Sequence, residues 1–229
     1  MQRVLLILVT FLSVSIPAST ISIGQSLDVN LTKGFYPSSY KGAQELLDEG
    51  IMKMYWRHGY GAGLWEQYRL DNGLSAEINL SWNKLMVKES FNESDLYINR
   101  YALHSLDAFL SAGYVLQPAP NLQLLAFAGL GYVHGWDEYM ELSFYDIEDS
   151  LGNGKVAQYW YDFDYHYDAV TVKGQIGVDY QNMGIRFSYV RELNRLHEEN
   201  FQNLPWIHRF ELAITARLFQ WKSAGQKGT

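Results

Sequence analysis

Histidine side chains recur at regular places in this 229-residue chain, and their spacing indicates a shared height. Five of the six lie on the same side of an apolar–polar alternation, and they are His58, His104, His134, His166 and His208. Each is about 13–15 residues from a tight turn or from the end of the pattern, which on tilted strands is on the order of 30 Å. At a membrane surface, imidazole can hydrogen-bond to phosphate or pair with it when protonated. The alternative is that these rings simply suit an interface.

A second set of ionisable residues alternates with apolar residues and carries both signs of charge. Its members are Glu77, Lys173, Asp179, Arg186, Glu211 and Arg217. Opposite charges gathered inside a narrow tube would pair, fix the alignment of its walls and block the passage of ions. A narrow gated channel is the alternative function of the same residues.

The segment 136–165 holds eight acidic residues and one basic residue, an excess equal to the net charge of −7 of the whole chain. Alternation continues on both sides of a turn-like stretch at 150–154, which predicts a hairpin. We expect this ribbon to protrude and to bind an extracellular protein or a glycan, because exposed strand edges and aromatic side chains favour interfaces. Its binding residues are Asp137, Glu138, Glu141, Tyr145, Glu148, Tyr159, Trp160 and Tyr161. The alternative is a solvated loop whose acids prevent aggregation.

Metal and cofactor signatures are missing from the sequence. The chain has no cysteine, which excludes disulfides and thiolate metal sites. Only His134 and His166 fall on neighbouring segments where a metal could bridge them, and the acids at 146–149 fit no standard calcium loop. We expect no metal, no cofactor and, from the acidic net charge, no nucleic-acid partner.

The elements that position these residues follow a period of two. Successive side chains of a strand point to opposite faces, so each alternating segment predicts a two-faced β-strand. The eight segments are 21–31, 60–70, 74–82, 106–116, 122–132, 170–180, 185–189 and 210–218. No later stretch reaches the roughly 18 apolar residues that a membrane-spanning helix needs.

The connections between these strands alternate strictly between tight and long. The tight ones, at 71–73, 117–121 and 181–184, contain Asn, Gly or Pro, whereas the long ones are 37–58, 88–95, 136–165 and 194–206. Strands that run up and down then place every tight turn and both termini at one end. The pattern predicts an all-β fold, an eight-stranded antiparallel up-and-down transmembrane β-barrel, which is closed because lipid tolerates no open edge.

A soluble barrel with an apolar interior would alternate too, but three features favour the membrane orientation. The polar face carries both signs of charge, aromatic residues of the apolar face gather near strand ends, and several glycines lie on the polar face, where a small barrel is crowded. Glu66 contradicts this scheme, since its parity places it on the lipid face. Either a bulge near Trp65 turns it inward, or it stays on the lipid face at a cost of about a few kcal/mol or less.

In this plan of strands and turns the chain resembles the small eight-stranded outer-membrane barrels of Gram-negative bacteria, the family of the OmpA transmembrane domain and OmpX. The resemblance is one of architecture and covers the mature chain to about Trp221. It implies a structural or adhesive role at the cell surface, in contact with membrane lipid and lipopolysaccharide. The last strand of such barrels usually ends in an aromatic residue, and here Phe219 is one residue out of phase.

Some barrels of this kind modify lipid A, and such an enzyme is the alternative function. We expect no catalytic residues here, because the adjacent His104 and Ser105 would point to opposite faces of a regular strand.

The two chain ends predict export and a tail. Arg3, an apolar run and small residues near Ala18 have the layout of a secretory signal peptide. We therefore expect a signal peptide at 1–18, a barrel at 19–221 and a polar tail at 222–229, and a monomer in the bacterial outer membrane.

Overall fold

The computed structural model describes residues 20–36, 41–91, 97–145, 156–161, 166–198 and 205–222. Within these ranges, the backbone alone is described for residues 42–44, 91, 97–101, 137–145, 156–161 and 197–198. The predicted signal peptide and nearly all of the predicted tail lie outside the described residues.

The described residues form ten strands and one short helix. The elements are β1 (Thr20–Phe35), α2 (Lys41–Asp48), β2 (Met52–Tyr55), β3 (Arg57–Arg69), β4 (Leu74–Phe91), β5 (Tyr97–Ala119), β6 (Leu122–Tyr145), β7 (Val156–Tyr161), β8 (His166–Tyr180), β9 (Met183–Glu198) and β10 (Trp206–Lys222). No helix in the described ranges has the length and apolar character that crossing a membrane requires.

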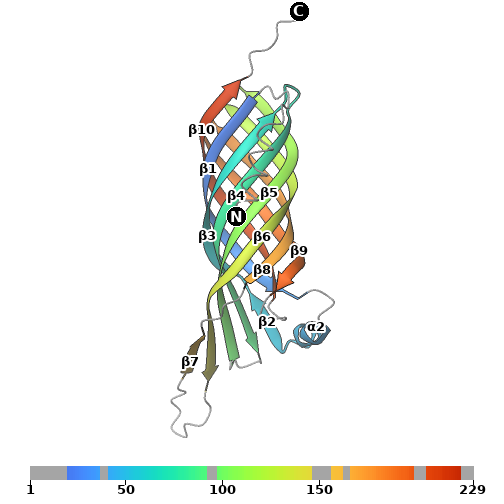
Figure 1. Cartoon of the computed structure of the whole chain (residues 1–229), viewed down its shortest axis with the longest axis vertical. Coiled ribbons are helices and arrows are strands. Elements are labelled where there is room, and N and C mark those ends of the chain that lie inside the picture. Colours follow the sequence, from blue (N-terminus) through green and yellow to red (C-terminus); the bar gives the residue numbers. More distant parts are fainter. Residues whose placement is uncertain are drawn as a thin grey trace, which may run out of the picture.

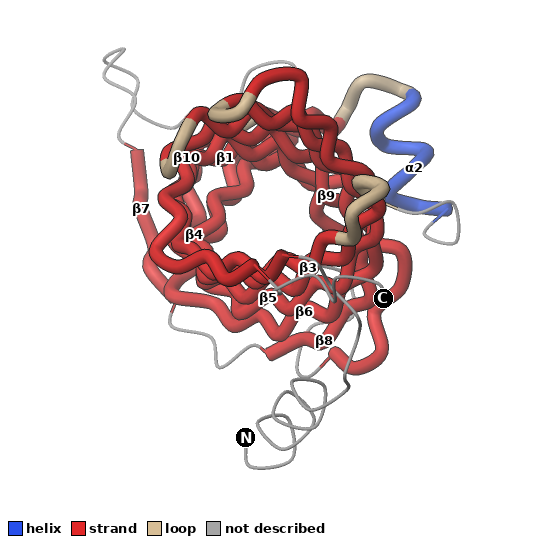
Figure 2. The backbone as a smooth tube through the Cα atoms, turned by 90° about the horizontal axis from the view of Figure 1, so that it is seen from above, coloured by secondary structure: helices blue, strands red, loops and turns tan. Residues whose placement is uncertain are grey.

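Eight of these strands close into a barrel (Figures 1 and 2). Around the ring, β1 pairs with β3, followed by β4, β5, β6, β8, β9 and β10, and β10 returns to β1. Every pairing in the ring is antiparallel. Closure leaves no unpaired edge along the wall, which is what lipid demands. The predicted eight-stranded up-and-down barrel is confirmed.

Tight turns join the strands at one end, as the sequence predicts. Between β3 and β4, Gly73 adopts φ 89°, and its N–H donates to the carbonyl of Leu70 at 3.0 Å. Between β8 and β9, Gln181 adopts φ 55°, a left-handed conformation that is uncommon outside glycine. Thr20 pairs with Lys222, so both ends of the barrel chain lie at this same end. The strand ends that flank the long connections lie at the other end.

The two faces of the wall differ as a lipid-facing barrel requires. The outer face is apolar, and Leu27, Leu130 and Ile176 each expose 60% or more of their surface. The inner face is polar through the middle of the barrel and so crowded that a Cβ on Gly131 would lie 2.3 Å from the Phe109 ring. Apolar exteriors and filled interiors are typical of small transmembrane barrels.

A β-bulge in β10 explains why Phe219 is one residue out of step with the alternation of the last strand. Between the pairs Ile23–Phe219 and Gly24–Arg217 the register shifts, which leaves Leu218 as an extra residue on β10. One extra residue reverses the alternation beyond it. Phe219 therefore returns to the outer face, where it is exposed and stacks on Trp221 with ring centroids 5.8 Å apart.

Of the two alternatives for Glu66, β3 has no bulge near Trp65 and the carboxylate stays on the outer face. The pairing of β3 with β1 and β4 shows no register shift, and Trp65 points into the lumen as a regular strand dictates. Glu66 stays on the outer face, where the Tyr68 hydroxyl hydrogen-bonds to its carboxylate. The bulge that does occur at this end is on β10, next to β1.

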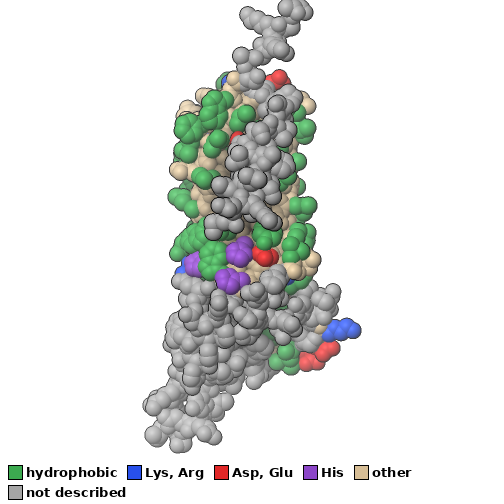
Figure 3. Space-filling model, in the orientation of Figure 1, with side chains coloured by type: hydrophobic (Ala, Val, Ile, Leu, Met, Phe, Trp, Pro, Cys, Tyr) green, Lys and Arg blue, Asp and Glu red, His purple; other side chains and the backbone are tan. Residues whose placement is uncertain are grey.

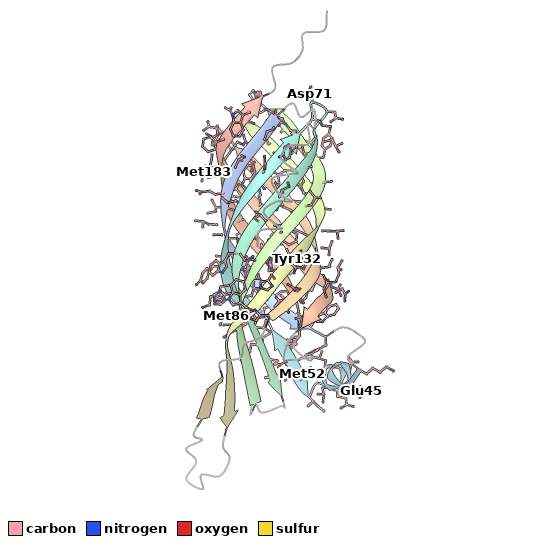
Figure 4. The ribbon with its side chains drawn as sticks, viewed as in Figure 1. Glu45, Met52, Asp71, Met86, Tyr132 and Met183 are labelled. Atoms are coloured by element: carbon pink, nitrogen blue, oxygen red, sulfur yellow. The ribbon has the colours of Figure 1, made fainter. Side chains whose placement is uncertain are left out.

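Beyond the barrel, the strands continue as a protruding sheet (Figure 1). Its strands pair side by side in the order β2, β4, β5, β6 and β7. The residue pairs farthest from the barrel are Met52 with Phe91, Phe91 with Tyr97, Tyr97 with Phe144 and Tyr145 with Val156. The predicted two-stranded ribbon is therefore part of a five-stranded sheet. In Figure 4, Asp71 marks the tight-turn end, Tyr132 lies near the outer end of the wall, and Met52 and Glu45 lie beyond it.

Candidate functional site

The half of the lumen nearer the tight turns holds a buried cluster of ion pairs. Arg186 donates to Glu77 at 2.7 Å and lies 3.8 Å from Asp179. Arg217 pairs with the same Asp179 at 3.3 Å. Trp65 covers the cluster, with its ring centroid 4.4 Å from the Arg186 guanidinium. Buried charges are costly unless they are paired, so these contacts bind the lumen faces of β4, β8, β9 and β10 together.

A second buried cluster lies nearer the outer end. Lys173 Nζ is 3.3 Å from Glu211, and Arg209 Nε donates to the other Glu211 oxygen at 2.6 Å. Arg209 also pairs with Asp107, to which Asn83 donates at 3.0 Å. Because β5 and β10 are not neighbours in the ring, the Arg209–Asp107 pair spans the lumen.

The six residues predicted for the lumen are divided between these clusters. The cluster nearer the tight turns contains Glu77, Asp179, Arg186 and Arg217, and the cluster nearer the outer end contains Lys173 and Glu211. The alternation placed Asp107 and Arg209 on the same face, but nothing in the sequence indicates that strands so far apart meet across the axis.

Apolar clusters occupy both ends of the lumen, which differs from the hydrophilic interior expected from the sequence. At the tight-turn end the cluster is Val115, Leu125 and Phe127. At the outer end it is Leu85, Val87, Leu103, Val133, Tyr167, Ala169 and Ile207, with Met54 packed against it. The inward parity simply continues past the polar middle with apolar residues. A lumen filled in this way gives no support to an open channel.

Four of the five interfacial histidines join aromatic contacts on the outer face. His104 stacks between Trp82 and Trp136, with ring centroids 5.4 and 5.6 Å away. His134 stacks on His166 at 5.9 Å, and its Nδ1 is 2.9 Å from Asp168. Figure 3 shows histidine side chains gathered in one band at the outer end of the apolar wall. The band crosses β4, β5, β6 and β8 at one level.

The remaining two histidines lie on the other side of the barrel. His208 of β10 stacks on Trp56 at 5.1 Å, and its Nδ1 is 3.3 Å from the Tyr189 hydroxyl. His58 of β3 is exposed. Trp56 lies between β2 and β3, outside any alternating segment, so sequence parity could not have placed it in this contact.

The described residues offer no catalytic or metal constellation of the usual kind. Ser105 is fully buried in the lumen, whereas His104 stacks on the outer face, so the wall separates the two side chains. His134 and His166 do meet, but no group of three or more histidine, aspartate or glutamate side chains gathers within the described part of the chain. The acids at 146–149 lie outside the described residues.

The acidic hairpin is described by its backbone alone. β7 pairs with β6 from Met140–Tyr161 to Tyr145–Val156, and Glu148 lies outside the described residues. A register shift between β5 and β6 leaves Glu138 as an extra residue on β6. The alternation of β6 beyond the shift is therefore displaced by one residue from that of the wall.

No family model and no curated protein matches this chain. Among solved structures it is similar to Ail, the attachment invasion locus protein of Yersinia pestis, which is 14% identical over 89% of this chain and 99% of that one, with a TM-score of 0.41. It is also similar to Neisserial surface protein A, 13% identical over 86% and 97%, with a TM-score of 0.42. OprG of Pseudomonas aeruginosa is 10% identical over 90% and 96%, with a TM-score of 0.46.

The class of the protein rests on its own strand pairing and its two faces, since identities and TM-scores this low are weaker guides. A closed eight-stranded antiparallel ring with an apolar exterior and a filled interior defines an outer-membrane transmembrane β-barrel. This is the architecture that the sequence resemblance implied.

Proposed function

We propose that the protein is an integral protein of the bacterial outer membrane that binds a partner at the cell surface through its protruding sheet. The observation that carries the proposal is the position of β7, which pairs with β6 and with no other strand in the described ranges. Among the described residues its second edge is unpaired, and it lies well beyond the wall. An extended segment can bind such an edge through its main chain.

The charge of the hairpin favours a basic partner. The segment 136–165 carries the acidic excess of the whole chain, and complementary charge speeds encounter and excludes wrong partners. One solved structure of Ail contains the heparin analogue sucrose octasulfate, which is a polyanion. A polyanion would be repelled by this hairpin, so we propose a basic protein segment as the partner here.

Cells of a non-adherent laboratory strain that display the protein provide the test. In one variant, residues 141–160 are replaced by Asn-Gly, which joins Met140 to Tyr161 by a two-residue turn. We expect this variant to lose adherence to epithelial cells and to an immobilised peptide of alternating valine and lysine. Unchanged adherence would contradict the proposal, provided that barrel folding is verified by heat-modifiable migration in electrophoresis.

A charge variant separates the electrostatic contribution of the hairpin from the effect of deleting its residues. Asp137→Asn, Glu141→Gln and Glu148→Gln together should weaken binding several-fold at low salt and much less at high salt, because exposed charges are screened beyond about 8 Å in physiological salt. The matched control changes the same number of acids near α2: Glu45→Gln, Asp48→Asn and Glu49→Gln. Equal losses in both variants would show that net charge, not the hairpin, drives adherence.

A further inference from the structure

Three side chains that carry or accept a proton lie side by side on the outer rim of the barrel. Lys33 of β1 pairs in register with His208 of β10, which pairs in register with Arg191 of β9. All three share the lipid-facing parity of their strands. Lys33 lies over Trp56 and Arg191 over Phe35, and both of these rings contact the His208 imidazole, so the three groups are close in space. We call these three residues the rim cluster.

In the part of the chain that the structure describes, aromatic rings rather than carboxylates accompany these cations. Lys33 Nζ lies 5.9 Å from the Trp56 ring centroid, and the Arg191 guanidinium lies 4.9 Å from that of Phe35. Within the described ranges neither cation forms a salt bridge. Two cations without a carboxylate partner among the described residues, with an imidazole between them, attract an anion, and phosphate is the anion found at the headgroup level of a membrane.

A hollow in the apolar wall lies on the membrane side of the rim cluster. It is shallow and open, with a volume of about 790 Å³, and its lining includes the small residues Ala112, Ala128 and Gly174 and the larger Ile176 and Tyr189. The small residues are in register across β5, β6 and β8, so they form one continuous depression. A Cβ on Gly174 would meet nothing within 4 Å, in contrast to the crowded glycines of the lumen.

Tyr189 joins the hollow to the rim cluster. It lines the hollow, and its hydroxyl lies 3.3 Å from His208 Nδ1. Arg191 pairs with Val172, two residues from Gly174 toward the outer end of β8, so Arg191 lies roughly 7 Å along the strand from the hollow. His208 and Lys33 follow on the next two strands at the level of Arg191. A molecule with a phosphate at one end and a hydrocarbon chain at the other matches this arrangement.

We infer that the outer wall between β1 and β6 holds a specific lipid, with its phosphate bound by Lys33, His208 and Arg191 and an acyl chain lying in the hollow at Gly174. The occupant is a phosphorylated lipid of the outer leaflet rather than free phosphate, because an inorganic ion would leave the apolar hollow unfilled. The site is separate from the protruding sheet, so its test does not depend on the proposed adhesive function.

Native mass spectrometry of the full chain in detergent tests the inference. The probes are dimyristoylphosphatidic acid, its short-chain dihexanoyl form, dimyristoylphosphatidylcholine and inorganic phosphate. We expect one phosphatidic acid molecule to be retained in preference to phosphatidylcholine, the long-chain form to bind more tightly than the short-chain form, and millimolar phosphate to leave it bound. Equal retention of the two headgroups, or displacement by inorganic phosphate, would overturn the inference.

Two variants separate the headgroup from the chain. Lys33→Gln with Arg191→Gln should lower the affinity for phosphatidic acid about thirtyfold and abolish the headgroup preference, since each basic residue contributes near an anionic surface. Gly174→Leu fills the hollow and should abolish the preference for the long chain while leaving the headgroup preference intact. If either variant binds the probes as the wild type does, the inference fails.

Matched controls use the same chemistry elsewhere. Lys41→Gln with Lys53→Gln removes two exposed cations near α2 and β2, and Ala62→Leu adds the same bulk at an exposed position of the outer wall on β3. Both controls should retain phosphatidic acid like the wild type. A loss in the controls equal to that in the variants would show a general effect of charge or bulk and would also overturn the inference.

Discussion

Positive charges inside the barrel and positive charges on its outer rim differ in the side chains that surround them. In the lumen, Arg186, Arg209 and Lys173 each lie against at least one carboxylate. On the rim, Lys33 and Arg191 lie against aromatic rings instead. Charges that are buried must be neutralised by the protein itself, whereas charges at the membrane surface can be neutralised by a ligand. The lumen charges therefore stabilise the fold, whereas the rim charges, which have no carboxylate partner among the described residues, are available to the lipid that we infer.

Glu211→Ala should give the largest loss of stability. It removes the carboxylate that both Lys173 and Arg209 contact and leaves two buried cations short of a partner. Removing one member of a buried pair costs about 3–5 kcal/mol. Urea unfolding in detergent micelles measures the free energy of unfolding, with the exposed Glu45→Ala as a control that should stay within about 0.5 kcal/mol. A loss below 1 kcal/mol for Glu211→Ala would remove the contrast between lumen and rim.

In the ion-pair cluster nearer the tight turns, Glu77 and Arg186 should contribute to stability as a coupled pair. Glu77→Leu or Arg186→Met alone leaves an opposite charge buried, and each should cost about 3 kcal/mol or more. The double variant removes both charges and should be more stable than the sum of the two losses implies by about 1–3 kcal/mol. A double-mutant cycle on unfolding free energies measures this coupling. Simple additivity would show that the 2.7 Å contact contributes little.

Substitutions at two glycines compare the packing of the inner and outer faces of the wall. Gly131→Ala places a Cβ 2.3 Å from the Phe109 ring and should cost about 1–3 kcal/mol through overpacking. Gly174→Ala meets open space and should be neutral or stabilise by about 0.5–1 kcal/mol, because alanine has less freedom to lose on folding. Thermal unfolding of the two variants under identical conditions distinguishes these signs. Equal losses would mean that the outer hollow is as tightly packed as the lumen.

The smallest effect on stability belongs to the rim. Lys33→Gln with Arg191→Gln should change the unfolding free energy by no more than about 0.5 kcal/mol in a zwitterionic detergent, since neither cation pairs with a carboxylate of the described residues. The same urea titration measures it, beside the large loss expected for Glu211→Ala. A loss above 1 kcal/mol would show that the rim cations support the fold itself.

The sequence alone determined the strands, their two faces and the alternation of tight and long connections. These features are local, because a period of two and turn residues such as Gly73 act on their immediate neighbours. Parity places Glu77 and His104 on opposite faces, and the charges, aromatic residues and glycines of the two faces indicate that Glu77 points inward and His104 outward.

Tertiary structure decided which of these residues meet. Asp107 and Arg209 come from strands on opposite sides of the ring, and the stagger of a closed barrel brought Lys33, His208 and Arg191 into one row. The bulge at Leu218 and the extension of the hairpin into a five-stranded sheet likewise depend on which strands pair and in what register. Register is fixed only when the ring closes, because each strand must satisfy two neighbours at once.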